Sequence, residues 1–517
     1  MRGDLRGPRD ARASSTRGGN AAGERAGVSR GHSSDMTRAG SNCDRPARGV
    51  VKGSGGLTRR EGPNRDEATG ATGSSCGNAP SGVAQARRDG APLEADSDLL
   101  SAILEQGNLR RAWQQVKANR GAAGVDGITI DEFPDKFRRE WPQLRRALEE
   151  GTYVPSPVRR VEMAKPDGGI RLLGIPTVLD RLIQQAIAQV LGPIFDPGFS
   201  DHSFGFRPGR CAGDAVRLVA KHIGADHRYA VDLDLSKFFD RVCHDILMSR
   251  LARKVNDRRV LRLIGRYLRA GVDVAGRYER TVGGVPQGGP LSPLLANVVL
   301  DDLDKELEQR GHRFARYADD FVILVKSPRA GERVMNSVRR FLERRLKLQV
   351  NAGKSAVRPT AELTFLGFAF KGVRIVWSEK SLQRFQHRIR ELTSRSWGVS
   401  MEYRLRQLAL YMRGWMGYFS LSETYAVVRQ LDHWIRRRLR CCYWKMWKTR
   451  RQRIRQLLRL GVKQKDAILH GLGSHGCWAM SRTPAVNQAL TRQWLRKQGL
   501  PSLTEQWVAI HYPTTVR

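Results

Sequence analysis

Hydrophobic residues recur at regular spacing only from about residue 98 onward, and their period changes along the chain. In residues 99–104 and 109–116 they return every three or four positions, which is the spacing of one helix face. In residues 161–177 two strand-like runs flank Pro-Asp-Gly-Gly, a sequence typical of a tight turn. These patterns predict two helices followed by a β-hairpin.

The two strongest strand signals both carry carboxylates. Residues 229–235 read Tyr-Ala-Val-Asp-Leu-Asp-Leu, so Asp232 and Asp234 alternate with apolar residues and share one face of the strand. Residues 314–325 form a second run of β-branched and aromatic residues, interrupted by Asp319 and Asp320. This pattern predicts a hairpin with both acids at its tip, where successive side chains face opposite sides and have different roles.

An acidic strand beside an acid-tipped hairpin can bring two or three carboxylates together around divalent cations. Hard oxygen ligands favour Mg²⁺, which completes its shell with water and substrate phosphates. Two such ions roughly 3.5–4 Å apart can activate an attacking hydroxyl and stabilise a leaving pyrophosphate. The pattern indicates nucleotidyl transfer, with Asp234, Asp319 and Asp320 as catalytic residues and metal ligands.

At these residues the chain resembles reverse transcriptases, and among them the reverse transcriptase/maturases encoded by group II introns. Residues 317–320, Tyr-Ala-Asp-Asp, are similar to the family's Y-A-D-D box, and residues 234–240 are similar to its D-[IL]-x-x-F-F-D box. Residues 203–210 resemble the S-x-G-F-R-P-x-R box, and residues 286–293 resemble P-Q-G-x-x-x-S-P. The resemblance covers residues 95–517, with the boxes in the family's order.

The resemblance implies four residues that contact the incoming nucleotide. Family members place a lysine and an arginine of the first hairpin on the triphosphate, which here are Lys165 and Arg171. Phe239, five residues after the catalytic aspartate, would clash with a 2′-hydroxyl and select dNTPs over rNTPs; a core phenylalanine is the alternative. Gln287 would lie beside the incoming nucleotide.

The resemblance also implies a right-hand polymerase. This is an α+β fold in which fingers and palm contain an antiparallel catalytic sheet, followed by an all-α thumb, or maturase, domain. We expect fingers and palm in residues 93–375, the thumb in residues 376–450 and a DNA-binding-like module in residues 451–517. Residues 1–92 are rich in Gly, Arg and Ser and predict a disordered basic tail. A loose RNA-binding segment and a start codon assigned too far upstream are two interpretations of this tail.

The net charge points to a polyanionic partner. The 517 residues include 90 Lys+Arg and 51 Asp+Glu, a formal net charge of +39, which is self-repulsive without nucleic acid. A basic membrane-surface protein is the alternative, but no apolar run approaches the roughly 20 residues that span a bilayer. Seven scattered cysteines without a C-x-x-C pair favour a reducing compartment. We expect a cytoplasmic bacterial protein, nucleoid-associated when bound to DNA.

Several basic residues are expected to contact nucleic acid. The helices after residue 378 interleave Arg and Lys with Trp and Tyr, which suits phosphate neutralisation and base stacking, and equally suits rings buried in a core. The boxes at residues 203–210 and 351–355 add basic residues by resemblance, with a purely structural loop as the alternative for the first. The expected set is Arg207, Arg210, Lys354, Arg436, Arg437, Arg440 and Lys445.

Three further acids receive no role in the site. Asp301, Asp302 and Asp304 follow the Pro-Gln-Gly box on a predicted helix. Clustered acids on a helix are typical of a solvated face, so we predict that these three face water.

The chain is therefore expected to be an RNA-directed DNA polymerase that uses dNTPs and Mg²⁺, with Mn²⁺ as a substitute. By the resemblance it copies group II intron RNA during retrohoming, extends a DNA primer on an RNA template, binds target DNA, and assists splicing as a maturase. No H-N-H-like His/Cys cluster follows, which favours priming from a nascent strand or an existing nick. The alternatives are a splicing cofactor that no longer polymerises, and a reverse transcriptase recruited to defence or diversity generation.

Overall fold

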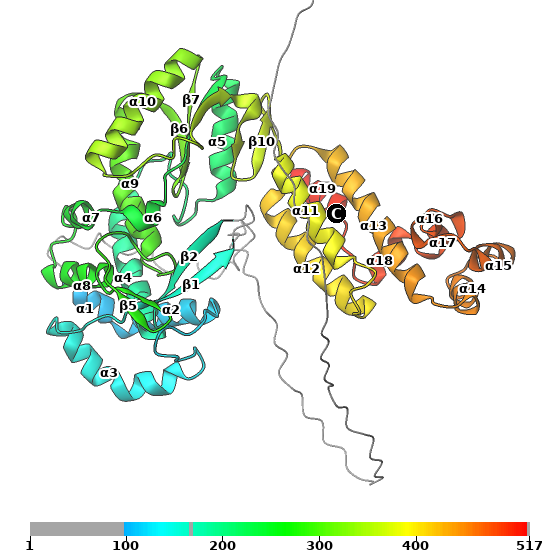
Figure 1. Cartoon of the computed structure of the whole chain (residues 1–517), viewed down its shortest axis with the longest axis horizontal. Coiled ribbons are helices and arrows are strands. Elements are labelled where there is room, and N and C mark those ends of the chain that lie inside the picture. The colour runs from blue at the N-terminus through cyan, green and yellow to red at the C-terminus, as the bar shows by residue number, and fades with distance from the viewer. Residues whose placement is uncertain (1–97, 165–168, 514–517) are drawn as a thin grey trace, which may run out of the picture. The chain divides into compact units, whose positions relative to one another are not determined.

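Three β-sheets and a helical C-terminal part are formed by residues 98–164 and 169–513, which this computed structural model describes (Figure 1). The predicted tail, residues 1–92, and Lys165 lie outside the described residues. None of the helices within those described ranges has the length and apolarity needed to cross a bilayer.

The sheet that carries the acidic residues is antiparallel, with the strand order β6-β7-β3-β8. Its central strand β3 (Tyr229–Leu233) pairs with β7 (Asp320–Val325) on one side and β8 (Ala356–Pro359) on the other. The edge strand β6 (Arg313–Tyr317) forms a hairpin with β7. The predicted acidic strand and hairpin are therefore confirmed as neighbours in one sheet.

Strand β7 is buried on both faces, which explains its continuous apolar run. Ile323 belongs to the hydrophobic cluster that includes residues of α10 (Pro328–Arg345). Val322 and Leu324, which point the opposite way, belong to the cluster that includes residues of α5 (Ala212–Gly224). Figure 1 shows these two helices on either side of the strands. The tip of the hairpin lies at the end of this packed region, where Ala318 is buried and Asp320 is exposed.

The second sheet has the order β2-β1-β4-β5. Strands β1 (Val158–Ala164) and β2 (Ile170–Ile175) pair antiparallel and confirm the predicted hairpin, whose turn lies outside the described residues. A parallel bridge joins β1 to β4 (Val272–Val274), which pairs antiparallel with β5 (Arg277–Glu279).

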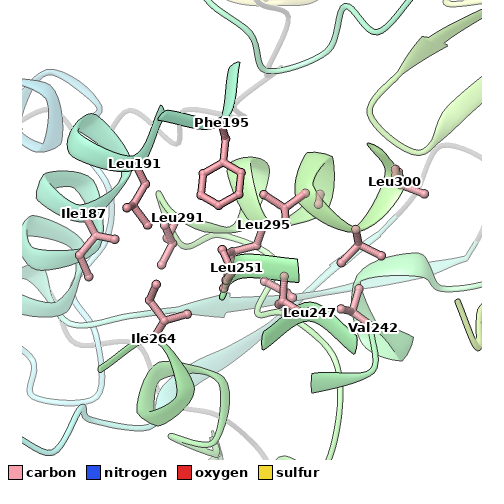
Figure 2. Close-up of a cluster of buried hydrophobic side chains, with 14 of the residues drawn as sticks. Ile187, Leu191, Phe195, Val242, Leu247, Leu251, Ile264, Leu291, Leu295 and Leu300 are labelled. Atoms are coloured by element: carbon pink, nitrogen blue, oxygen red, sulfur yellow. The ribbon is translucent and has the colours of Figure 1, made fainter. Parts of the chain in front are cut away.

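Helices between and around these sheets share one hydrophobic core, part of which is shown in Figure 2. In α4 (Val178–Phe195) the buried residues Ile187, Leu191 and Phe195 recur every four positions, as expected for one helix face. Truncating one such buried side chain to alanine typically costs about 2–5 kcal/mol. The remaining helices here are α1 (Leu99–Leu104), α2 (Gln106–Ala118), α3 (Phe133–Glu149), η1 (Asp196–Gly198), α6 (Phe238–Arg241), α7 (His244–Leu251), α8 (Arg258–Leu268) and α9 (Ser292–Gln309).

The third sheet and the C-terminal helices share a second core. The indole of Trp377, at the end of this sheet, donates a hydrogen bond to the carbonyl of Phe419 at 2.7 Å. Phe385, Ile389 and Leu392 form the buried face of α11, as the helical spacing predicts. The elements are η2 (Thr360–Glu362), β9 (Thr364–Phe365), β10 (Phe368–Lys371), β11 (Arg374–Trp377), α11 (Glu379–Leu392), α12 (Met401–Phe419), α13 (Tyr425–Met446), α14 (Arg450–Arg459), α15 (Gln464–Leu472), α16 (Cys477–Met480), α17 (Pro484–Ala489), α18 (Arg492–Lys497) and α19 (Leu503–His511).

Candidate active site

The β6–β7 hairpin presents its two acids through a two-residue turn. Tyr317 pairs with Asp320 across the strands, so Ala318 and Asp319 form the loop. Ala318 has a φ of 59°, and a positive φ at the first loop residue occurs in the primed turns that match the twist of a hairpin. Because a non-glycine residue is strained in this conformation, surrounding structure must hold the turn.

The guanidinium of Arg316 holds the turn from inside the protein. Arg316 is completely buried and donates to the carboxylate of Asp304 at 2.7 Å and to Oδ1 of Asn297 at 2.9 Å. It also donates to Oγ of Ser203 at 2.7 Å and to the carbonyl of Ala318 at 3.0 Å. Since the last bond ends on the turn itself, this network fixes the backbone immediately before the first catalytic acid.

The predicted solvated face at Asp301, Asp302 and Asp304 is wrong. Asp304 is 0% exposed and forms the buried ion pair with Arg316, while Asp302 accepts a hydrogen bond from Arg250 at 2.7 Å. The side chain of Asp301 is also mostly covered. The spacing of acids along α9 does not reveal that Arg316 of β6 and Arg250 of α7 will pack against them.

A loop from the box at residues 203–210 supports the same turn. The N–H of Phe204 donates to the carbonyl of Arg316 at 2.9 Å, which places this loop along the edge strand β6. A Cβ added to Gly205 would lie 2.3 Å from the amide nitrogen of Ala318. Glycine is therefore required here because the loop touches the backbone of the turn.

Asp234 directly follows β3 and is held by a segment that comes after α10. Its backbone N–H donates to Oγ of Ser355 at 3.0 Å, and Asn351 donates through Nδ2 to its carboxylate at 3.1 Å. The carbonyl of Asp234 accepts a further hydrogen bond from the N–H of Asn351 at 2.8 Å. Neither Asn351 nor Ser355 was expected to have this role, and only the box at residues 351–355 hinted at it.

The register of the sheet brings Asp234 to the hairpin tip. Leu233 of β3 lies opposite Phe321 of β7, so the next residue along β3 reaches the level of Asp320. The electrostatics agree, because the negative charge of Asp234 raises the pKa of both Asp319 and Asp320. The sheet therefore brings together three acids from two distant stretches of sequence.

Mutual repulsion is built into this cluster. Burial, together with the negative charges of Asp319, Asp234 and Asp232, raises the pKa of Asp320 to about 6, although its side chain still reaches solvent. Burial also raises the pKa of Asp319, and the positive charge of Arg171 lowers the pKa of both hairpin acids. A divalent cation would relieve this repulsion between partly desolvated carboxylates.

The donor set fits Mg²⁺ without forming a closed cage. In the described ranges, no three His, Cys, Asp or Glu side chains gather closely enough to enclose a metal ion by themselves. Mg²⁺ retains water and takes one or two carboxylates plus substrate phosphates, so an open, oxygen-only set suits it. The carboxylate of Asp232 is paired with Arg358 at 3.5 Å, which supports Asp234 over Asp232 as the ligand.

Two of the residues expected to bind the nucleotide, Arg171 and Phe239, are described by the structure, and their roles stay predictions. Arg171 is exposed on β2, and its charge acts on Asp319 and Asp320. Phe239 is half-buried, with its ring edge-on to Phe238 at a centroid distance of 5.1 Å. Phe239 packs against the main hydrophobic core with part of its surface accessible, so it contributes to the core, and its role in sugar selection stays a prediction.

The glycine-rich loop that carries Gln287 is hydrogen-bonded to both the β1–β2 hairpin and α6. The N–H of Gly174, near the end of β2, donates to the carbonyl of Gln287 at 2.8 Å. Gly288 has a φ of 129°, and a Cβ there would lie 2.6 Å from the carbonyl of Gly174. On the other side, the N–H of Val285 donates to the carbonyl of Phe239 at 2.6 Å. Through these backbone hydrogen bonds the loop places Gln287 close to Phe239.

Known proteins with sequences similar to this chain include one from Escherichia coli and one from Lactococcus lactis. Protein YkfC from Escherichia coli (strain K12) is 32% identical over 318 residues, covering 54% of this chain and 82% of its own length. Group II intron-encoded protein LtrA from Lactococcus lactis subsp. cremoris is 37% identical over 240 residues, covering 46% of this chain. The match spans 39% of LtrA, less than half of its length.

Two family models match consecutive parts of the chain. Residues 163–370 match a model described as reverse transcriptase (RNA-dependent DNA polymerase), and residues 382–461 match the group II intron, maturase-specific domain. The chain belongs to the group II intron-encoded reverse transcriptase/maturases. Among solved structures, a chain of a partial Cas6-RT-Cas1–Cas2 complex is 22% identical with a TM-score of 0.32, covering 48% of this chain and 43% of its own.

Family membership confirms the expected fold class and enzyme class. The reverse transcriptase is an α+β protein with antiparallel sheets followed by a helical C-terminal part, and the reverse transcriptase match spans both acidic boxes. It is an RNA-directed DNA polymerase with a maturase-specific domain, and its class of enzyme depends on a divalent metal.

The structure contradicts the nucleic-acid contact expected of Arg207 in this reverse transcriptase. Its side chain is 4% exposed and donates through Nε to the carboxylate of Asp196 at 2.7 Å. It also donates to the carbonyls of Ser200 at 2.6 Å and Ser203 at 3.0 Å. A guanidinium bonded inside the protein cannot reach a phosphate, so the structural alternative is correct for Arg207. Arg210 binds Asp201 and stays partly exposed.

The basic residues expected along α13 divide into two kinds. Arg436 is paired with buried Asp432 at 3.3 Å and is 12% exposed, so its expected phosphate contact conflicts with an internal ion pair. Arg440 is half-buried and donates to the carbonyl of Leu490. Arg437 lies over the ring of Trp478 at 3.6 Å, and Lys445 is exposed. Lys354, outside this helix, is exposed as well, and its contact remains a prediction.

The aromatic residues at the end of α13 belong to the core. Trp444 is 0% exposed, Trp447 is 7% exposed and Tyr443 is 9% exposed. Of the two interpretations of the interleaved basic and aromatic residues, the core is correct for these three rings. The bases of an RNA therefore require other stacking partners in this part of the protein.

Proposed function

We propose that this reverse transcriptase copies group II intron RNA into DNA during retrohoming and acts as a maturase that binds the intron RNA and assists splicing. The observation that carries the proposal is the convergence of Asp234, Asp319 and Asp320 at one end of the antiparallel sheet. Its substrates are an RNA template with a DNA primer, dNTPs and target DNA. We propose the bacterial cytoplasm as its location, with the nucleoid when it is bound to DNA.

We assign metal binding to the three acids and triphosphate binding to two basic residues of the β1–β2 hairpin region. Asp234, Asp319 and Asp320 would hold Mg²⁺, or Mn²⁺ in its place, which supplies activation of the primer 3′-hydroxyl and stabilisation of the leaving pyrophosphate. Arg171 would bind the triphosphate as a planar fork, together with Lys165.

Selection and placement of the nucleotide fall to the neighbouring loop. Phe239 is half-buried and would exclude a 2′-hydroxyl, while Gln287 sits on the loop bonded to both β2 and α6. Arg316 and Gly205 would hold the turn in position without touching the substrate.

Purification of the full chain with its bound RNA tests this proposal. We expect the sequenced RNA to be a group II intron, and we expect the protein to extend a DNA primer on that RNA with dNTPs and Mg²⁺. Bound intron RNA without primer extension in either Mg²⁺ or Mn²⁺ would identify a splicing cofactor. Primer extension with no intron RNA would favour a recruited reverse transcriptase.

A further inference from the structure

A cavity of about 520 Å³ lies among the C-terminal helices. It is formed by the end of α11, the segment that follows it, α13 and the start of α16. We call it the basic cavity, because four cationic side chains and two hydroxyls dominate its lining. These are Arg390, Arg395, Arg438, Lys445, Ser394 and Ser396.

The positive charges of the basic cavity are not neutralised by the protein. No acidic residue of the described chain is among the lining, and none of the four cationic side chains forms an ion pair there. Burial lowers the pKa of Arg438, and the positive charges of Arg390 and Arg395 lower it further. Bringing like charges together is unfavourable, and a bound anion offsets that cost.

Two of the arginines are held in place by the protein. Arg438 donates through Nε to Oγ1 of Thr393 at 2.5 Å and through Nη2 to the carbonyl of Arg390 at 3.2 Å. The guanidinium carbons of Arg390 and Arg438 lie 5.6 Å and 5.4 Å from the ring centroid of Trp434. The Trp434 ring therefore holds the guanidinium groups of Arg390 and Arg438 near each other, which preorganises them to bind an anionic group.

An aromatic side chain lies beside these cations. A smaller hollow of about 140 Å³ shares Arg395 and Arg438 with the basic cavity and is also lined by Trp478. Trp478 carries the guanidinium of Arg437 over its ring at 3.6 Å and is still 42% exposed, in contrast to the buried rings at the end of α13. An accessible indole next to a phosphate-binding group is the combination that binds unpaired nucleotides.

We propose that the basic cavity binds the phosphate of one unpaired nucleotide, with the base against Trp478, and so anchors a single-stranded part of a bound RNA. The cavity volume falls in the range of small-ligand sites, roughly 300–1,000 Å³, which suits one nucleotide, and a base can lie against Trp478 only when it is unpaired. Only the identity of the RNA as an intron rests on the proposed function. Lys445, which was expected to contact nucleic acid, lines this cavity, so the proposal assigns its contact to a defined site.

The test compares two fluorescent RNA probes, a hairpin with an unpaired loop and a blunt duplex of the same stem. We expect Arg390→Gln with Arg395→Gln to weaken binding of the looped probe about tenfold, as for one stacked and phosphate-bound nucleotide, and to change duplex binding little. The matched control, Lys380→Gln with Arg406→Gln, removes the same charge from exposed positions outside the cavity. Equal weakening of both probes, or no weakening, overturns the proposal.

Salt dependence and a second variant separate the two contacts. The arginine pair should lower the slope of log affinity against log salt by about 0.7, since the two arginines are proposed to neutralise one phosphate and each single-strand phosphate contributes about 0.7. Trp478→Ala should weaken binding of the looped probe without changing that slope. A slope change in Trp478→Ala equal to that of the arginine pair would overturn the assigned roles.

Competition distinguishes RNA from a free nucleotide. If AMP shifts the melting temperature of the full chain but not of the arginine pair, while RNA binding is equal in both, the ligand is a free nucleotide and the RNA proposal fails. Primer extension by the same preparations reports the polymerase separately, because these variants keep all three catalytic aspartates. Loss of extension in the unmodified chain would therefore count against the proposed function and not against the cavity.

Discussion

The tip of the β6–β7 hairpin concentrates negative charge, whereas the basic cavity of the C-terminal helices concentrates positive charge. At the hairpin tip, the negative charge of Asp234 raises the pKa of Asp319 and of Asp320, and the positive charge of Arg171 opposes this only in part. In the basic cavity, arginines crowd one another without a carboxylate. Neither region neutralises its own charge, which is why we propose a divalent cation as the counterion of the acids and a phosphate as that of the arginines.

The two regions are also held by different forces. Backbone contacts and a buried ion pair position the acids, because Arg316 bonds the turn itself and Gly205 packs on it. In the basic cavity, a ring and two hydrogen bonds hold flexible arginines. We therefore expect the catalytic region to tolerate less change than the cavity.

The largest effect should come from removing the hairpin acids. Asp319→Ala with Asp320→Ala removes several kcal/mol of metal-assisted stabilisation, so cDNA synthesis should fall by at least about a thousandfold in primer extension. Intron RNA binding and assisted splicing should largely survive, because the basic cavity is unchanged. An Asp226→Ala control, at an exposed position before β3, should keep both activities. Equal loss of cDNA synthesis and splicing in a folded double variant would show that the two regions do not act separately.

The buried ion pair should have the next largest effect. Asp304→Asn leaves the charge of Arg316 uncompensated and should lower the free energy of unfolding by about 3–5 kcal/mol, measured by urea denaturation. Replacing both partners, with Asp304→Leu and Arg316→Leu, should recover much of that stability while primer extension stays low, because Ala318 loses its donor. Wild-type extension in the double variant would reduce the pair to a structural role.

Gly205 tests how closely the turn must be held. In Gly205→Ala the new methyl group would lie 2.3 Å from the nitrogen of Ala318, so the turn or the loop must move. We expect overpacking to cost about 1–3 kcal/mol of stability and the displaced acids to lower kcat about tenfold to a hundredfold. Gly192→Ala, where nothing lies within 4 Å, is the matched control and should leave kcat unchanged. Equal kcat values in the two variants would show that the turn is loosely held.

The smallest effect concerns pH and lies away from both charged sites. Burial lowers the pKa of His222 to about 4, with the positive charges of His202, His227 and Arg313 adding to the shift. The unfolded chain keeps a pKa near 6.5 and binds the proton first, so stability should fall as pH drops from about 6.5 to about 4. His222→Gln should flatten this part of a melting-temperature profile. An unchanged profile would show that other groups control it.

Local pattern was sufficient to predict the acidic strand and the hairpin beside it, while the catalytic role of their three acids stays a prediction. The period of two around Asp234 and the hairpin run around Asp319 and Asp320 report backbone conformation, which neighbouring residues determine. The spacing of the boxes indicated the family before any contact was known. From the amino-acid sequence alone, therefore, the family was identified and Asp234, Asp319 and Asp320 were assigned as candidate metal ligands.

Only the tertiary structure decided what each charge contacts. Asp304 and Arg207 appear solvated or nucleic-acid-facing in the sequence, yet both are buried in ion pairs with partners from other elements. Asn351 reaches Asp234 across 117 positions of chain, and the rings around Trp444 turn inward. The physical reason is that spacing defines a face of an element, whereas the folding of distant segments onto that face determines whether it meets water, a counterion or the core.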